Sequence, residues 1–383
     1  MEYLYFTIYS LIIVLGAFLV SWGAESAQIL VSQGLVLAVL AWVQILPEFS
    51  VEATLSYSAA KNPKELDFVA ANFTGSIRLL VGVGIPLIFL TRAIFLHSLR
   101  KALSYKIILP RLHGISVVGN FVPIIIFLLV IVKKSLSLLD SIILIIIYGV
   151  YLWVLKKTPP AGEEQTEEMD FIPRKISGLS SFLRWFIIAT LFAGGGTIFY
   201  FFVHPFVESC KVIAVKLGLS AFIFIQWVAP FLTEFPEKLT VFYWAKNEKK
   251  APIGLLNILN ANISQWTLLP AMIPIVYFIG SGNVNIRWDE KHILEIALTM
   301  AQTVFLTSLL MDKNLNFWDA ILIFILWFIQ FLSPLFGSRY IEDSVREIMI
   351  FLYLALSLLK ITISILKKQD SHIYSDFIEL LKR

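Results

Sequence analysis

The stretch Leu46-Pro47-Glu48-Phe49-Ser50-Val51-Glu52 places two carboxylates inside a long run of apolar residues. A second stretch, Thr233-Glu234-Phe235-Pro236-Glu237, does the same, and its Pro-Glu pair lies 189 residues after the first. An ionisable side chain in the hydrocarbon region of a membrane carries a large free-energy penalty. Four such side chains in two matching places therefore indicate one polar site that two halves of the chain share.

The composition predicts an integral membrane protein. The chain has 383 residues, of which 58% are hydrophobic and 15% charged, and its mean hydropathy is +0.80. Soluble domains are about 45–50% apolar and about 25% charged. Many apolar runs reach 18 residues with few charges, which is typical of membrane helices and not of barrel strands. We therefore expect an all-α, polytopic membrane protein.

We predict ten or eleven transmembrane helices. The apolar segments lie roughly at residues 3–21, 27–59, 67–97, 113–132, 137–155, 180–203, 213–245, 252–281, 291–311, 316–335 and 344–366. The two segments that hold the acidic stretches are longer than the ~20 residues that a bilayer needs. Both contain proline, so we expect each to be broken or bent at the centre of the protein.

The sequence contains an internal repeat. Its landmarks are Trp-Val at 42–43 and 227–228, Pro-Glu at 47–48 and 236–237, and Ala-Lys-Asn at 60–62 and 245–247. The offset stays between about 183 and 190 residues. Five spans, an odd number, precede the second copy, so matching segments cross the membrane in opposite directions. This arrangement is an inverted-topology repeat, whose broken helices meet near the middle of the membrane.

These patterns predict the domain organisation and the topology. We expect a first five-helix repeat at 1–156, a polar linker at 157–178, a second five-helix repeat at 179–336, and an extra helix with a tail at 337–383. Lysine and arginine are more frequent on the side that includes the linker, and this side should be cytoplasmic. The N-terminus is then outside a plasma membrane, and the linker and the C-terminus are cytoplasmic.

Oxygen donors gather near the two acidic stretches, as a hard cation requires. The candidate cation-binding residues are Glu48, Glu52, Glu234, Glu237, Asn72, Thr74, Ser76, Asn260, Asn262 and Gln265, and further neutral donors are Ser50, Thr233, Asn257 and Ser264. This set contains neither histidine nor cysteine. It favours Ca²⁺, Na⁺ or H⁺ over zinc or copper.

These motifs resemble the α-repeats of the cation/Ca²⁺ exchanger superfamily. Pro47-Glu48 is followed by Asn72-Phe73-Thr74-Gly75-Ser76, and the second copy, residues 262–269, is similar to prokaryotic sodium/calcium or sodium/proton exchangers. The resemblance covers residues 22–90 and 205–280. It implies that Glu48 and Glu237 are the central ligands of Ca²⁺ or another hard cation, that Asn72 and Asn262 are further ligands, and that Ca²⁺ is exchanged for Na⁺ or H⁺.

The sequence departs from the family pattern where side chains help to hold sodium. Gln44-Ile45-Leu46 stands in place of Gly-Thr-Ser, and Ile77 in place of asparagine. Exchange of Ca²⁺ for H⁺ follows from charge balance, because neighbouring carboxylates in a low dielectric take up protons when no cation is bound. A monovalent Na⁺/H⁺ antiporter on the same fold is the alternative.

Other interpretations explain less of the sequence. An intramembrane enzyme would need a nucleophile or metal motif, which the sequence does not show, and a channel usually assembles its filter from several chains. The basic residues lie between apolar runs, so we expect no nucleic-acid partner, and we expect no cofactor. Glu48 and Glu237 could be structural acids paired with a lysine or with backbone, but the duplication argues against this. Arg78 could pair with a site carboxylate or replace a cation.

Overall fold

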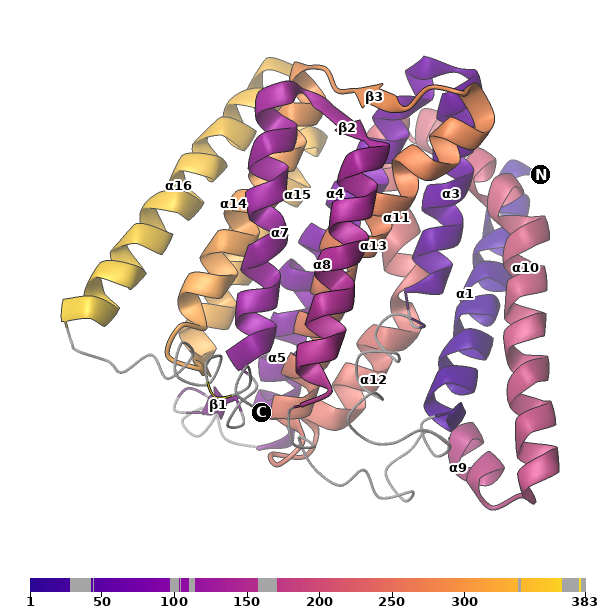
Figure 1. Cartoon of the computed structure of the whole chain (residues 1–383), viewed down its shortest axis with the longest axis horizontal. Helices are drawn as coiled ribbons and strands as arrows, with labels where there is room; N and C mark the ends of the chain where they lie inside the picture. Colours follow the sequence, from indigo (N-terminus) through magenta and orange to yellow (C-terminus); the bar gives the residue numbers. More distant parts are fainter. Residues whose placement is uncertain are drawn as a thin grey trace.

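Nine helices among the described residues are long and apolar enough to cross a membrane. The computed structural model describes residues 1–27, 43, 45–96, 103, 105–109, 114–157, 171–336, 339–366 and 379 (Figure 1). The long helices are α1 (Glu2–Ala27), α7 (Gly114–Lys133), α8 (Leu138–Leu155), α10 (Ser181–Lys216), α13 (Ala251–Ser281), α14 (Glu290–Leu309), α15 (Phe317–Phe336) and α16 (Arg339–Leu366). The protein is a polytopic helical membrane protein, as its composition predicts.

The ninth span runs from Pro63 to Phe95 and changes its helical form on the way. It consists of a short 3₁₀ turn η2 (Pro63–Glu65), α4 (Leu66–Leu79), a π-helical turn η3 (Leu80–Gly84) and α5 (Ile85–Phe95). The shorter helices are α3 (Leu46–Lys61), α9 (Phe171–Ser177), α11 (Ala221–Thr233) and α12 (Phe235–Ala245). Most of the predicted linker, residues 158–170, lies outside the described residues, and α9 forms its end.

The outer faces of the bundle are apolar, as contact with lipid requires. On α8, the side chains of Leu139, Ile142, Ile146 and Val150 are each more than half exposed. They recur every three or four residues and so form one stripe of the helix. A soluble protein rarely leaves an apolar face of this kind uncovered.

The second acidic stretch lies at a break between two helices, as predicted. Helix α11 ends at Thr233 and α12 begins at Phe235, and Glu234 between them has φ −94° and ψ 5°. Glu234 and Glu237 are therefore not on one face of a continuous helix. In the first repeat, α3 begins at Leu46 with Pro47 in its first turn. Ile45, which corresponds to Glu234 and directly precedes α3, has φ −86° and ψ 2°. Residues 28–42 and 44 lie outside the described residues.

Two small β-ribbons show the inverted relation between the halves. Strand β1 (Lys106–Ile108) pairs with β4 (Asn314–Asn316), and β2 (Ser135–Ser137) pairs with β3 (Asn285–Arg287). Strands β1 and β3 each follow the third span of a repeat, and β2 and β4 each precede its fifth span. Exchange of the two halves therefore converts one ribbon into the other. Figure 1 shows β1 at one end of the bundle, and β2 with β3 at the opposite end.

The match between the ribbons extends to single hydrogen bonds. The Leu109 N–H donates to the Lys313 carbonyl at 2.8 Å, and the Trp288 N–H donates to the Lys134 carbonyl at 2.9 Å. Both lysines have a left-handed backbone, with φ of 50° at Lys134 and 56° at Lys313. The underlying sequences, Lys-Ser-Leu-Ser-Leu-Leu-Asp at 134–140 and Lys-Asn-Leu-Asn-Phe-Trp-Asp at 313–319, share lysine, leucine and aspartate at the same places.

The two halves approach each other closely where α4 crosses α11. An added Cβ at Gly75 of α4 would lie 2.0 Å from the carbonyl oxygen of Gln226 in α11. A backbone atom cannot turn aside as a flexible side chain can. The glycine of the Asn72–Ser76 motif is therefore required for packing between the repeats.

We predict that Gly75→Ala destabilises the protein by about 1–3 kcal/mol or more, because α4 and α11 must move apart. The measurement is the midpoint of thermal unfolding of the purified protein in detergent. The matched control is Gly149→Ala in α8, where an added Cβ meets nothing within 4 Å. Equal midpoints for the two variants would contradict the close crossing.

Candidate cation-binding site

Two glutamates of the first repeat lie next to one amide in the centre of the bundle. Glu48 and Glu52 are one turn apart on α3, and both are fully buried. The Nδ2 of Asn72 in α4 donates to Oε1 of Glu48 at 2.5 Å and to Oε2 of Glu52 at 2.8 Å. Three of the predicted site residues are thus in direct contact.

A hydrogen bond connects this group to the second repeat. The Oγ1 of Thr233, at the end of α11, donates to Oε2 of Glu48 at 2.5 Å. Thr233 precedes Glu237 by four residues, and four residues span at most about 14 Å. Glu237 is also buried, with 3% of its surface exposed. The two Pro-Glu carboxylates therefore lie in the same interior region and not on the lipid face.

The glutamates of the second repeat have different partners. Glu237 Oε1 accepts a hydrogen bond from Nδ2 of Asn257 in α13 at 3.3 Å. Glu234 forms an ion pair with Lys238, at 2.5 Å from Nζ to Oε2, and its Oε1 accepts from Nε2 of Gln265 at 2.7 Å. The predicted pair of Glu234 and Gln265 is thus in direct contact.

Several buried oxygens of this region have no hydrogen-bond donor among the described residues. They are Glu52 Oε1, Asn72 Oδ1, Glu237 Oε2, Asn257 Oδ1, Asn262 Oδ1 and Gln265 Oε1. Burial of an unpaired polar atom is unfavourable, so each such atom in a folded protein requires an explanation. Carboxylate and amide oxygens are the ligands that hard cations prefer. The chemistry of these atoms fits a bound cation.

Other predicted residues use their hydrogen bonds elsewhere. Asn262 donates to Oδ1 of Asn120 at 2.6 Å, and Oδ1 of Asn260 accepts from Tyr151 at 2.6 Å and from Ser116 at 3.1 Å. These contacts join α13 to α7 and α8. The hydroxyls of Thr74 and Ser76 donate to carbonyls of their own helix, those of Ala70 and Phe73. Among the predicted neutral donors, contacts to the site glutamates are seen for Asn72, Thr233, Asn257 and Gln265.

Lys238 belongs to the candidate site through Glu234, and it is not among the residues predicted from the sequence. Its side chain is 6% exposed and lies one helical turn after Glu234. A usable signal was present, since a lysine inside an apolar run and four residues after a glutamate forms an ion pair on a helix. From the sequence, Asn257 is only one of many neutral donors.

A second buried charge cluster surrounds Glu295 of α14. Nη2 of Arg78 lies 2.5 Å from Oε2 of Glu295, and Nε of Arg346 lies 2.6 Å from Oε1. Gln226 also donates to Glu295 Oε2, at 3.0 Å. Arg78 therefore pairs with Glu295 and not with a site carboxylate. Through Arg346, the same cluster attaches the extra helix α16 to the centre of the protein.

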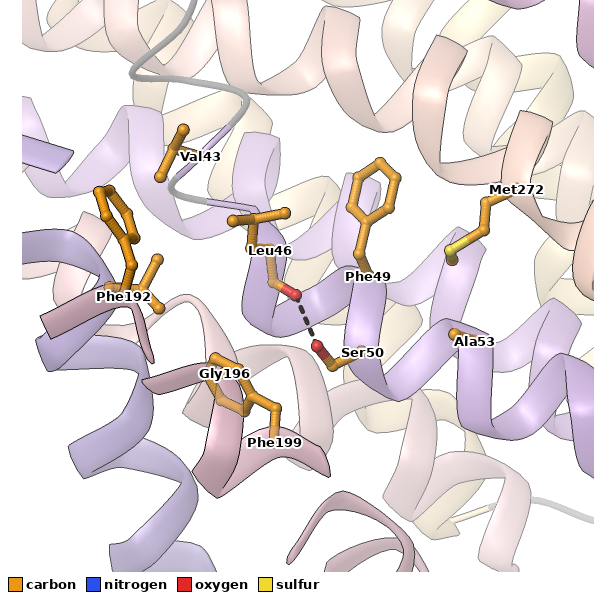
Figure 2. Close-up of a pocket in the computed structure, with 10 residues that line it drawn as sticks. Val43, Leu46, Phe49, Ser50, Ala53, Phe192, Gly196, Phe199 and Met272 are labelled. Carbon is orange, nitrogen blue, oxygen red and sulfur yellow. Dashed lines mark hydrogen bonds between the residues drawn. The ribbon is translucent and has the colours of Figure 1, made fainter. Parts of the chain in front are cut away.

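An apolar pocket of about 580 Å³ lies beside the turn that carries Glu48. Phe49, Ser50, Phe192 and Met272 line it, together with other apolar residues of α1, α3 and α10 (Figure 2). The Ser50 hydroxyl donates to the Leu46 carbonyl at 3.0 Å. None of the described residues that line the pocket carries a carboxylate, so the pocket and the oxygen cluster are separate features.

The fold and the site together define a class of protein. Inverted repeats that bring buried carboxylates to helix breaks in the interior are the architecture of secondary transporters. The sequence matches the family described as "Sodium/calcium exchanger protein" over residues 1–157 and 187–336. The chain therefore belongs to the sodium/calcium exchanger protein family, within the cation/Ca²⁺ exchanger superfamily that its motifs resemble. A comparison with curated proteins finds no match.

Solved structures share the fold. The crystal structure of the H⁺/Ca²⁺ exchanger CAX superimposes with a TM-score of 0.88 at 24% identity, over 100% of this chain and 92% of that chain. A structure of the sodium-calcium exchanger NCX_Mj superimposes with a TM-score of 0.57 at 19% identity, over 87% of this chain and 98% of that chain. The predicted inverted-repeat fold agrees with these matches.

We predict that Glu295→Gln destabilises the protein by about 3–5 kcal/mol, because it leaves Arg78 and Arg346 buried without their shared carboxylate. Thermal unfolding in detergent measures the effect. The matched control on the same helix is Glu290→Gln, since the Glu290 side chain is 82% exposed and pairs with Lys134 at the surface. We expect Glu290→Gln to lower the free energy of unfolding by only about 0–1 kcal/mol. Similar losses for both variants would argue against the buried cluster.

Proposed function

We propose that the protein is a secondary active antiporter that exchanges Ca²⁺ for H⁺ or Na⁺ across the membrane. The observation that supports this best is the set of buried carboxylate and amide oxygens without donors, at the contact between the two repeats. Membership of an exchanger family supports the same conclusion. The function of an enzyme or of a channel would not explain why buried oxygens from two inverted repeats lie at the contact between them.

Glu48 and Glu237 are the proposed central ligands of the transported cation. Glu52 and Asn72 complete the first half of the ligand set, and Asn257 contributes to the second half. Ca²⁺ takes 6–8 oxygen ligands, and water can supply those that the protein does not. A divalent ion also neutralises carboxylates that would repel one another in a low dielectric.

Competition for one site would enforce the exchange. When Ca²⁺ leaves, protons can neutralise the same carboxylates, so the site is never left highly charged. The flanking helices then move around the fixed site and expose it to each side in turn. Na⁺ is the other candidate counter-ion, because members of this family are sodium/calcium exchangers by description.

We further propose that the N-terminus lies outside a plasma membrane, with the linker and the C-terminus in the cytoplasm. The excess of lysine and arginine on the linker side supports this orientation. We also propose the division into repeats at 1–156 and 179–336, with α16 as an addition to the second repeat. The two β-ribbons support this division, because each joins one half to the other.

We predict that Glu48→Gln abolishes Ca²⁺ uptake into proteoliposomes that carry an outward proton or sodium gradient. The variant keeps the shape of the side chain but removes one charge from the ligand set. Glu208→Gln, on the half-exposed side chain that pairs with Lys211, is the control and should transport normally. Undiminished Ca²⁺ flux in Glu48→Gln would rule out the proposed role. Uptake of ²²Na⁺ but not of Ca²⁺ by the wild type would favour the monovalent antiporter.

We predict that the Ca²⁺ affinity falls as the pH is lowered, because protons and Ca²⁺ compete for the same carboxylates. Each proton released on binding reduces the affinity by up to about tenfold per pH unit. Isothermal titration in buffers of different ionisation enthalpy measures both the affinity and the number of protons released. A Ca²⁺ affinity that does not change with pH would leave Na⁺ as the counter-ion.

A further inference from the structure

We propose that Lys238 determines the ion selectivity of this site. Its ammonium group acts as a tethered monovalent cation on Glu234, so Na⁺ is excluded from Glu234 and the divalent ion is left to Glu48, Glu52 and Glu237. This inference rests on the proposed function and specifies which carboxylates serve the transported ion.

Glu234 differs from the other three site glutamates because one of its partners is a cation. One of its oxygens accepts from Gln265 at 2.7 Å, and the other pairs with the Lys238 ammonium at 2.5 Å. Glu52 and Glu237, in contrast, each keep one buried oxygen without a donor among the described residues. Both oxygens of Glu234 are thus occupied, one of them by a cation, whereas Glu52 and Glu237 each still have an oxygen to offer to a cation. Both oxygens of Glu48 also accept hydrogen bonds, but from the neutral donors Asn72 and Thr233.

The lysine belongs to one repeat only. With Pro47-Glu48 aligned on Pro236-Glu237, Lys238 corresponds to Phe49, and Glu234 corresponds to Ile45. Glu52 in turn has Val241 as its counterpart. Each repeat therefore adds a second glutamate at a different place, and only the second repeat adds a cation beside it. The four carboxylates and one ammonium give the site three formal negative charges when all are ionised.

Tethering gives the ammonium an advantage over a free monovalent ion. Lys238 and Glu234 are held one helical turn apart, so the ammonium is always present at a high effective concentration. A monovalent ion that approaches Glu234 must displace a cation of the same charge that cannot diffuse away. A divalent ion is attracted twice as strongly to the remaining carboxylates.

The experiment measures Ca²⁺ binding to the purified full-length protein at one pH, with and without Na⁺. Isothermal titration is carried out at about 0.15 M total salt, with N-methylglucamine replacing Na⁺ in the reference. In the wild type, we expect the same Ca²⁺ affinity in both salts. In Lys238→Met, Na⁺ can occupy the vacated position and should lower the Ca²⁺ affinity by about tenfold, a usual size for coupling between two ligands.

Two further variants test the charge and the packing separately. Lys238→Arg keeps a cation and should remain insensitive to Na⁺. Lys238→Gln removes the charge but keeps a hydrogen-bond donor for Glu234. It replaces Lys238→Met in the experiment if that variant does not fold, and its Ca²⁺ affinity should likewise fall in Na⁺. Lys249→Met, at an exposed turn beyond α12, is the control for loss of one positive charge and should behave as the wild type.

The outcomes distinguish the inference from the proposed function. A wild type that binds no Ca²⁺ would overturn the proposed function and the inference with it. A wild type that binds Ca²⁺ in competition with Na⁺ would overturn the inference alone. The inference is also overturned if the Lys238→Met and Lys238→Gln variants fold and bind Ca²⁺ with an affinity that does not change with Na⁺.

Discussion

Carboxylates that are buried in an apolar bundle need a partner, and this requirement organises the centre of the molecule. Glu48 meets it with Asn72 and Thr233, which come from α4 and from the end of α11. The Glu48–Thr233 hydrogen bond joins the two repeats, so the site exists only when both halves are folded. The helix break at Glu234 ends α11 directly after Thr233 and so places this hydroxyl within reach of Glu48. The need of the buried Glu48 carboxylate for hydrogen-bond donors thus connects the duplication, the broken helix and the contact between the halves.

The two repeats satisfy this requirement by different means, although their folds correspond. The first repeat relies on an amide, since Asn72 serves both Glu48 and Glu52. The second repeat uses a cation, Lys238, beside Glu234, and an amide, Asn257, beside Glu237. The centre of the protein is therefore asymmetric in charge, whereas the ribbons at its two ends are matched to the level of single hydrogen bonds. Duplication has kept the scaffold and has let the polar groups of the two copies diverge.

The sequence was sufficient to predict the helices and their repeat, because membrane spans and proline positions are strong local signals. It also singles out Glu48, Glu52, Glu234 and Glu237, since charge in an apolar run is rare, and all four are buried in the structure. The partners of these residues were harder to assign. Asn257, Asn260 and Asn262 lie within two turns of α13, and only the packing of that helix decides which of them reaches Glu237. The Lys-x-Leu-x-x-x-Asp repeat at 134–140 and 313–319 is a weaker signal, because it is short and lies at the edges of apolar segments.

The attachment of α16 has a consequence for how the chain is made. Glu295 is completed by Arg346, which is accompanied on its own helix by the acids Glu342 and Asp343. Synthesis from the N-terminus makes Arg78 and Glu295 before Arg346, so α16 brings the second arginine to a carboxylate that already has its first. A chain cut short before residue 339 therefore carries an incompletely paired glutamate in its interior.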